Sequence, residues 1–254
     1  MALFTNVYDH LYGLALFCSH TRMITCMALL CSHICLTLTD SRLGVLLQSS
    51  YEFPGRYARW SIGFVDPPIS IEGKQDECVI TALNERGLVL LPAIQAKMEE
   101  LRSDSVLMSV DTVNDPQSIP TTSPNTLSAS TTTSIKLRLV PPSPPGTFSE
   151  EDRTRQPSLF SIIRAVRDLF GFTSNDGQLG LYGSFGYDLT FQFEPIKQSL
   201  ERDPEQRDLL LFLPDKILVV DQDKRDAWTL DYEFGVNGKT TSNLPRIAKQ
   251  TAFR

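Results

Sequence analysis

The sequence predicts an α+β fold dominated by antiparallel strands. Short apolar runs alternate with turn-forming residues, which is typical of a β-meander. A nearly continuous apolar run and an alternating segment, joined by the polar sequence "DQDKRD", indicate an antiparallel hairpin. Only two segments carry apolar residues at helical spacing, so helices are expected to be the minority. With 254 residues, the chain is long enough for one large domain or two small ones.

Residues 36–102 are expected to form a compact β-meander closed by a helix. The strand-like runs are "RWSIGFV", "ISIE", "CVITAL" and "LVLLPAI", and the sequences "DPP", "GKQD" and "NERG" between them favour turns. The next segment, "AIQAKMEEL", places Ile94, Met98 and Leu101 at helical spacing. This segment is therefore the expected closing helix.

Residues 103–148 have the composition of a disordered Ser/Thr/Pro-rich loop. Ten of the fifteen residues in Pro120–Ser134 are Ser or Thr, which leaves almost nothing to bury. The sequence "LVPPSPPG" adds a stiff polyproline-like stretch. Between them, "SIKLRLV" alternates apolar and basic residues, so one edge strand is expected to dock back onto a sheet. We therefore expect the loop to interrupt one domain rather than to separate two.

The clearest helix is expected in "QPSLFSIIRAVRDLFG". Its apolar residues recur at helical spacing, Ser158 is a candidate N-cap, and Gly171 is a candidate C-terminal stop. The hairpin follows further along the chain. Its strands are "LLLFLPDKILVVD", a nearly continuous apolar run split by Pro214-Asp215, and "AWTLDYEF", in which apolar and polar residues alternate.

Three glycines at three-residue spacing lie among aromatic residues in "GLYGSFGYDLTFQFEP". A dinucleotide-binding loop needs GxGxxG followed by a helix, and a P-loop needs GxxxxGK followed by Ser or Thr. Here Gly180, Gly183 and Gly186 have different spacing, and strand-forming aromatic residues follow them. Glycines within a strand mark bulges or a close approach of another backbone, and that reading is favoured.

Composition and charge exclude several functions. The net charge is −6 with a pI of about 5.1, and no run of basic residues is present, which argues against an extended nucleic-acid interface. All three histidines, His10, His20 and His33, lie near the N-terminus, so a Ser-His-Asp arrangement is poorly supported. Cys78 is expected to be a small buried hydrophobic residue. A small molecule or a protein is therefore the expected partner.

Residues 1–35 form an atypical apolar extension rich in Cys and His. Four of the five cysteines lie in it, and their clustering favours a reducing compartment for the rest of the chain. Its apolar run, residues 23–38, is shorter than the ~20 residues of a membrane-spanning helix. The repeated "CSH" suggests a metal site but lacks the paired spacing of zinc modules. Metal binding, targeting or membrane contact, and a simple accessory extension remain open for this segment.

The segment "LLQSSYEFPGRYARWSIGF", residues 46–64, combines hydroxyl, amide and guanidinium groups with aromatic rings. Such groups are what a pocket for a small zwitterion would use. The alternative is a strand-turn-strand unit whose polar groups only satisfy a tight loop.

Several blocks of sequence together resemble the N-terminal, non-catalytic region of anthranilate synthase component I. They are "RLGVLLQSSYEFPGRYARWSIGFVDPP", "FSEEDRTRQPSLFSIIRAVRDLFG", "GLYGSFGYDLTFQFEPI" and "DPEQRDLLLFLPDKILVVD". The nearest likeness is to forms in which a glutamine amidotransferase is fused to the same chain. The resemblance covers residues 36–102 and 135–250.

The resemblance implies a fold and a domain division. In this family two antiparallel sheets form a β-sandwich with outer helices, and the glycine-aromatic stretch looks like an inner strand of it. Residues 36–245 would then be the N-terminal domain, interrupted by the loop 103–148, and 246–254 a truncated tail. The fold would be incomplete without the C-terminal domain.

The family converts chorismate and ammonia from glutamine into anthranilate and pyruvate with Mg²⁺, in the cytoplasm, toward tryptophan. Its catalytic and metal-binding residues lie in a C-terminal chorismate-binding domain that nothing in this sequence matches. We therefore expect no catalytic residue, no metal site and no cofactor in this chain, which alone would be inactive. Its expected partners are that domain, a glutamine amidotransferase domain or subunit, and tryptophan as an effector.

The resemblance also implies a feedback site. The segment Leu46–Ser49 resembles the family's Leu-Leu-Glu-Ser element, which binds the inhibitor tryptophan, and "RWSIG" resembles the strand beside it. Gln48 replaces the usual Glu and removes a charge. The implied effector-binding residues are Leu47, Gln48, Ser49, Arg59 and Ser61. A stand-alone amino-acid-binding or interaction module, or part of an aminodeoxychorismate synthase, are the alternatives; "YEFPGRY" and "FGYDLTFQFEP" favour the anthranilate branch over the latter.

Overall fold

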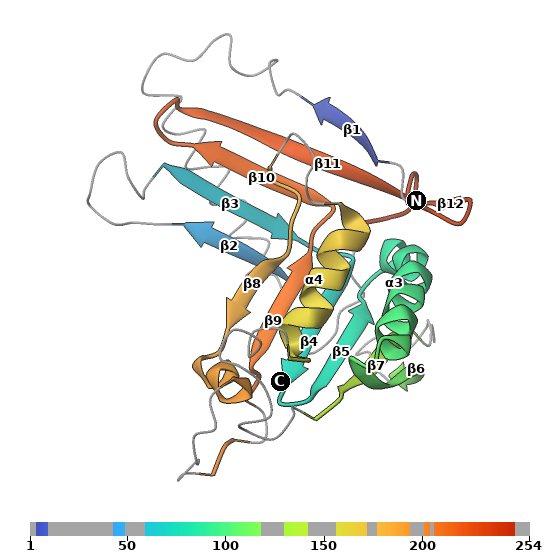
Figure 1. The fold of residues 1–254 in the computed structure, drawn as a ribbon. Coiled ribbons are helices and arrows are strands. Elements are labelled where there is room, and N and C mark those ends of the chain that lie inside the picture. The colour runs from blue at the N-terminus through green and yellow to red at the C-terminus, as the bar shows by residue number, and fades with distance from the viewer. Residues whose placement is uncertain are drawn as a thin grey trace, which may run out of the picture.

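The backbone forms two antiparallel sheets and a small number of helices (Figure 1). The computed structural model describes residues 4–9, 43–48, 59–117, 130–141, 156–171, 177–193, 201–203 and 206–246. In this part of the chain all neighbouring strands run antiparallel. The specific sandwich type that the family resemblance implies stays a prediction.

Sheet I has the strand order β1-β11-β10-β3-β2, with the short strand β12 paired to β11. Its strands are β1 (Phe4–Asp9), β2 (Gly44–Gln48), β3 (Trp60–Val65), β10 (Lys216–Asp221), β11 (Asp226–Val236) and β12 (Lys239–Thr240). The expected hairpin around "DQDKRD" is confirmed, because β10 and β11 pair with Asp221 opposite Asp226.

Sheet II has the order β6-β7-β5-β4-β9-β8. Its strands are β4 (Ile69–Lys74), β5 (Glu77–Ala82), β6 (Leu107–Gln117), β7 (Ser130–Leu139), β8 (Tyr182–Phe185) and β9 (Leu209–Leu213).

A two-stranded ribbon runs through both sheets and joins them. Strand β3 pairs with β10 in sheet I, and their continuations β4 and β9 pair in sheet II. The ribbon bends at Asp66–Pro68 on one strand and at Pro214–Asp215 on the other. Proline has no N–H to donate to a ladder, so it suits these corners. Asp66 adopts a positive φ of 51° there, and its N–H donates to the Leu43 carbonyl at 2.7 Å.

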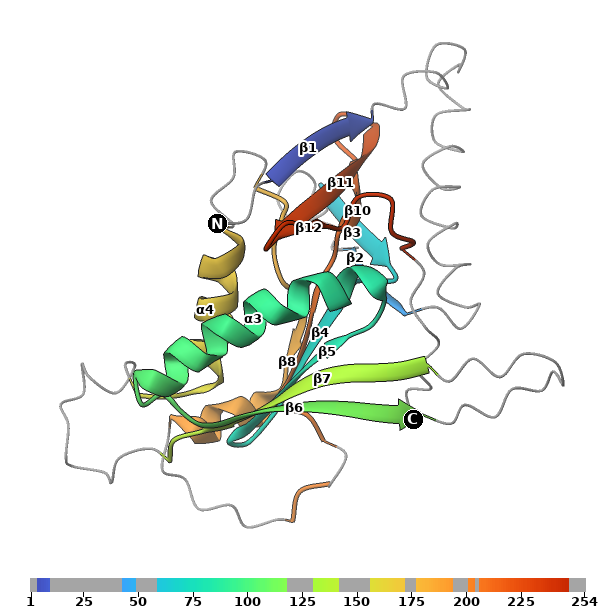
Figure 2. The ribbon, with the colours of Figure 1, turned by 90° about the vertical axis from the view of Figure 1, so that its right-hand side faces the viewer.

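Helices α3 (Glu85–Ser103) and α4 (Leu159–Phe170) pack with both sheets around one core (Figures 1 and 2). Helix α3 contacts β5, β6 and β7 of sheet II as well as β11 of sheet I. On α4, Phe170 meets Phe234 of β11 edge-on, with ring centroids 5.6 Å apart. The predicted caps of α4 are confirmed, since Ser158 is the N-cap and Gly171 adopts the left-handed conformation at φ 57°.

Helix α3 is longer than the sequence predicts. The run "LVLLPAI" was expected to be a strand, and this prediction is wrong because it forms the first half of the 19-residue helix. The Asn84 side chain caps the helix by accepting a hydrogen bond from the Gly87 N–H at 3.0 Å. Leu90, Leu91, Ile94 and Met98 are buried at helical spacing along it. The spacing extends across Pro92, which lies inside the helix.

The predicted loop 103–148 contains two strands instead. Strands β6 and β7 pair from Leu107 opposite Leu139 to Gln117 opposite Ser130. Strand β6 was missed because it lies at the edge of sheet II, where Asp111 and Thr112 are exposed and the apolar pattern is weak. The run "SIKLRLV" does form a strand, β7, but β7 lies between β6 and β5 rather than at the edge.

Residues 4–9 of the predicted N-terminal extension form strand β1 at the edge of sheet I, where β1 pairs with β11. The "CSH" repeats of that extension lie outside the described residues. In the part of the chain that the structure describes, no helix is long and apolar enough to cross a membrane.

The glycine-aromatic stretch forms edge strand β8 followed by the 3₁₀ helix η2 (Tyr187–Gln192), so the expectation of an inner strand is wrong. The close backbone approach is confirmed at two of its glycines. A Cβ on Gly183 would lie 2.0 Å from the Leu210 carbonyl oxygen, and one on Gly186 would lie 2.9 Å from that of Arg207. A Cβ on Gly180 would meet only the Tyr182 ring, at 3.8 Å.

A buried guanidinium connects α3 to sheet I. Arg86, which is 1% exposed, donates to the buried Asp215 carboxylate at the ribbon corner. It also donates to the Tyr232 carbonyl at 2.8 Å and the Thr241 carbonyl at 2.6 Å, and it lies 3.1 Å from Glu233. A buried charge is stable only when it is paired and hydrogen-bonded, and Arg86 meets this condition only when helix, corner and β11 are assembled.

We expect Arg86→Met to lower the free energy of unfolding by about 3–5 kcal/mol, because it removes the hydrogen-bonded partner of the buried Asp215 and leaves only the more distant Arg246, at 3.5 Å. Urea unfolding followed by circular dichroism measures this. Arg102→Met on the same helix is the control, since Arg102 pairs with Glu99 in water and its loss should change stability by at most about 1 kcal/mol. Equal effects of the two substitutions would contradict the structural role of Arg86.

We expect Gly183→Ala to lower the free energy of unfolding by about 3 kcal/mol, because the new methyl group meets a backbone carbonyl in a paired strand that cannot move aside. Gly180→Ala makes the same chemical change where only ordinary contact results, and should stay within about 0.5 kcal/mol. Thermal unfolding of both variants decides the matter, and a Gly183→Ala protein as stable as Gly180→Ala would refute the close approach.

Candidate effector site

Of the effector-binding residues implied by the resemblance, Leu47 and Gln48 lie on β2, Ser61 lies on β3, and Arg59 directly precedes β3. Antiparallel pairing places Gln48 opposite Ser61 and Leu47 opposite Ile62. Directly paired residues share a face of the sheet and successive residues alternate, so Gln48 and Ser61 lie on one face and Leu47 on the other. Ser49 lies outside the described residues.

The two faces of sheet I have different surroundings. Ile62 belongs to the face that packs with the helices, together with core residues such as Val219 and Leu230. Gln48 and Ser61 therefore lie on the face that turns away from this core. The Ser61 side chain is nevertheless buried, with 1% exposed.

Arg59 is held by an acidic residue at the end of β10. Its Nε and Nη2 atoms donate to the two carboxylate oxygens of Asp221, at 3.1 and 2.8 Å. Asp221 is fully buried and also accepts hydrogen bonds from the backbone N–H groups of Asp223 and Lys224. The hydrogen bond to Asp221 raises the pKa of Arg59. The hydrogen bonds from Arg59 and from these N–H groups lower the pKa of Asp221, although burial opposes this.

The guanidinium of Arg59 lies on the Trp60 side of the sheet, not on the Ser61 side. It stands 4.6 Å from the centroid of the Trp60 ring, a cation–π distance. Trp60 in turn meets Trp228 edge-on with centroids 6.1 Å apart. Of the implied site residues, Gln48 and Ser61 are thus register partners on one face of the sheet, whereas Leu47 and the Arg59 guanidinium lie on the other.

The β10–β11 turn contacts both Arg59 and Ser61. The side-chain amide of Gln222 donates to the Ser61 Oγ atom at 3.0 Å, and its backbone N–H donates to the Arg59 carbonyl at 2.8 Å. Sequence reasoning missed Asp221 and Gln222, because they lie about 160 positions away in a turn that reads as a polar connection. The strand pairing of β3 with β10 was the missing information.

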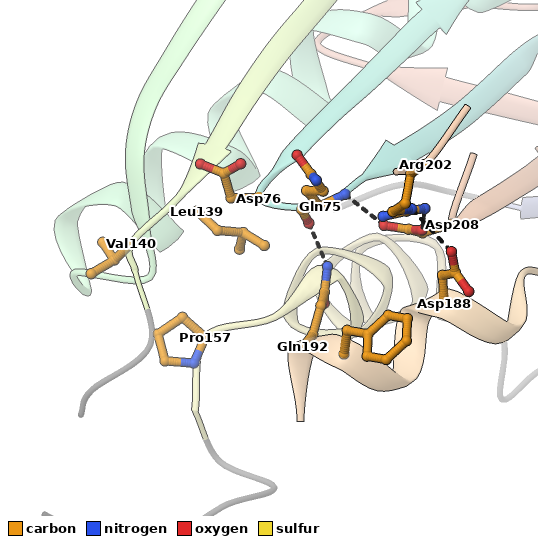
Figure 3. A pocket seen from close by; sticks show the side chains of 10 residues that line it. Gln75, Asp76, Leu139, Val140, Pro157, Asp188, Gln192, Arg202 and Asp208 are labelled. Atoms are coloured by element: carbon orange, nitrogen blue, oxygen red, sulfur yellow. Dashed lines mark hydrogen bonds and ion pairs between the residues drawn. The ribbon is translucent and has the colours of Figure 1, made fainter. Parts of the chain in front are cut away.

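A cavity of about 310 Å³ lies elsewhere, at the end of sheet II (Figure 3). Its walls come from the β4–β5 turn, the end of β7, η2, Arg202 and Asp208. Apolar groups such as Leu139 and Phe191 line it beside charged ones.

The charged groups of this cavity bind one another. Arg202 pairs with Asp208 and lies 3.0 Å from the Asp188 carboxylate. The buried Asp208 also accepts a hydrogen bond from the Gln75 N–H at 2.6 Å, as Figure 3 shows. Asp76 pairs with Arg138 at 3.0 Å. These contacts hold the segment around Asp208 against sheet II. Because the charged groups are paired with one another, they do not indicate which ligand the cavity would bind.

Two curated proteins are similar to this chain. An anthranilate synthase from Azospirillum brasilense is 43% identical over 215 residues, which are 85% of this chain and 26% of that protein. The chain is homologous to one part of anthranilate synthase. Anthranilate synthase component 1 of Vibrio cholerae serotype O1 is 24% identical over 189 residues, which are 74% of this chain and 31% of that protein. No protein-family model matches.

This homology confirms the resemblance drawn from the sequence blocks, and the chain spans less than a third of the length of these anthranilate synthases. Among the described residues, no group of three or more His, Cys, Asp or Glu side chains is placed to hold a metal ion. Burial raises the pKa of Cys78 to about 12, which keeps this thiol protonated and unreactive at neutral pH.

Asp221 should make the stability of the protein depend on acidic pH. Because its pKa is lower in the folded protein than in the unfolded chain, ionised Asp221 stabilises the fold above pH ~4, and this stabilisation is lost as pH falls through the lowered value. We expect the stability difference between the native protein and Asp221→Asn to be constant near neutral pH and to shrink below pH ~4. Urea unfolding across pH measures it, with Asp223→Asn as the control. A difference that grows in acid would contradict the assignment.

Proposed function

We propose that this chain is the N-terminal, regulatory part of an anthranilate synthase component I and acts in tryptophan biosynthesis. The observation that carries the proposal is the 43% identity to an anthranilate synthase over 85% of the chain. The chorismate-binding and glutamine amidotransferase functions would then belong to other parts of the enzyme. In this role the chain's own task is to bind tryptophan as a feedback effector.

The geometry of β2 and β3 supports an effector site on the outer face of sheet I. Gln48 and Ser61, which the family resemblance assigns to tryptophan, face the same side as register partners. The Ser61 hydroxyl can donate to a ligand carboxylate, and an amide in place of Glu at position 48 can accept from the ligand ammonium. Leu47 and Arg59 would support the site through the strands rather than touch the ligand.

Two features are expected to make tryptophan binding weak in this chain alone. Because Ser61 is 1% exposed, a ligand reaches its hydroxyl only after a rearrangement, and the free-energy cost of that rearrangement opposes binding. A further wall of the pocket would come from the rest of the enzyme. Leaving about 100 Å² of indole surface in water, at about 25 cal/mol/Å², costs about 2.5 kcal/mol, or nearly two decades in affinity.

Titration calorimetry with L-tryptophan tests the proposal. We expect a dissociation constant approaching about 1 mM, for the reasons above, and weaker binding still in Ser49→Ala and Ser61→Ala, each of which removes a hydroxyl from the site. Ser109→Ala on edge strand β6 is the control and should bind like the native protein. Absence of any heat of binding, or tight binding that survives both substitutions, would show that the chain is not this effector domain.

A further inference from the structure

We propose that Gln222 is a positioning residue of the tryptophan site and decides which ligand group Ser61 can bind; this inference rests on the proposed function. A serine hydroxyl has one hydrogen to donate and two lone pairs to accept with. Gln222 Nε2 donates to Ser61 Oγ at 3.0 Å, so it occupies an acceptor position of the hydroxyl. The hydrogen of Ser61 is thereby left for another acceptor.

Among the residues that the structure describes, none accepts that hydrogen. Ser61 is 1% exposed, yet within the described part of the chain its hydroxyl only accepts a hydrogen bond. A buried donor without an acceptor is unfavourable, so the site is suited to an incoming anionic oxygen. The carboxylate of an amino acid supplies such an oxygen, and a hydrogen bond to a charged group is stronger than a neutral one.

Gln222 is itself fixed in place by the turn. Its backbone N–H donates to the Arg59 carbonyl, and the neighbouring Asp221 binds the Arg59 side chain. Asp221 also accepts from two backbone N–H groups of the turn. The amide of Gln222 therefore approaches Ser61 from a turn that is secured on both sides of it. Arg59 contributes to tryptophan binding through this turn and not by contact with the ligand.

The test replaces the hydrogen-bond donor at position 222 with an acceptor of nearly the same shape. In Gln222→Glu the carboxylate accepts the Ser61 hydrogen and places a negative charge beside the ligand carboxylate. We expect calorimetry to show tryptophan binding weakened by about tenfold or more. Tryptamine, which has the ammonium and indole of tryptophan but no carboxylate, should bind the variant at least as well as it binds the native protein. A residue with a purely structural role would affect both ligands alike.

Two further variants complete the design. Gln95→Glu makes the same chemical change on helix α3 and should leave both affinities unchanged. In a double-mutant cycle, Gln222→Ala and Ser61→Ala should weaken tryptophan binding to a similar degree. The double variant should bind about as weakly as either single variant, because both substitutions act through one hydroxyl.

The outcomes separate the two proposals. If the native protein binds no tryptophan, the effector-domain function fails and Gln222 loses its assigned role with it. If the native protein binds tryptophan but Gln222→Glu binds it equally well, or loses tryptophan and tryptamine together, only the role of Gln222 is overturned. The emission of Trp60 and Trp228, the two tryptophans of the chain, shows whether the variant keeps the native turn.

Discussion

The buried pair of Arg86 and Asp215 is the interaction on which the assembly of the two sheets depends. An unpaired guanidinium in this position would be strongly unfavourable, and its partners come from the ribbon corner and from β11. Arg246 adds a second cation 3.5 Å from Asp215 and 2.9 Å from Asp231. Helix α3, packed on sheet II, is thus joined to sheet I by charge as well as by the apolar core.

The same corner determines where the candidate effector site lies. Asp215 precedes β10, and β10 pairs with β3 so that Asp221 lies opposite Trp60. This register brings the β10–β11 turn beside the start of β3, where it contacts Arg59 and Ser61. The corner at Asp215 fixes one end of β10 and therefore positions the polar groups of the β10–β11 turn at its other end. The candidate effector site thus depends on this corner without contacting it.

The sequence predicted those elements whose signals are local. Helix α4 has both caps and an apolar face, and the β10–β11 hairpin has an apolar run before its polar turn and an alternating segment after it, so each could be assigned from neighbouring residues. Local sequence signals failed to predict the secondary structure of segments whose conformation is determined by tertiary packing. The first half of α3 resembles a strand because "LVLLPAI" is a short apolar run, and β6 is an edge strand with too few apolar residues to stand out. The family resemblance implied that the segments holding Gln48 and Ser61 lie beside each other, whereas their register and the roles of Asp221 and Gln222 required the strand order.

Native-state hydrogen exchange in low concentrations of urea tests the central claim most directly, namely that the two sheets form one cooperative unit joined through Arg86. The amides of Ile71 in sheet II and Val219 in sheet I are buried in paired strands of the common core. The account predicts that both exchange only through the same global opening, with equal free energies and equal dependence on urea. Exchange of one sheet at a distinctly lower free energy than the other would contradict it.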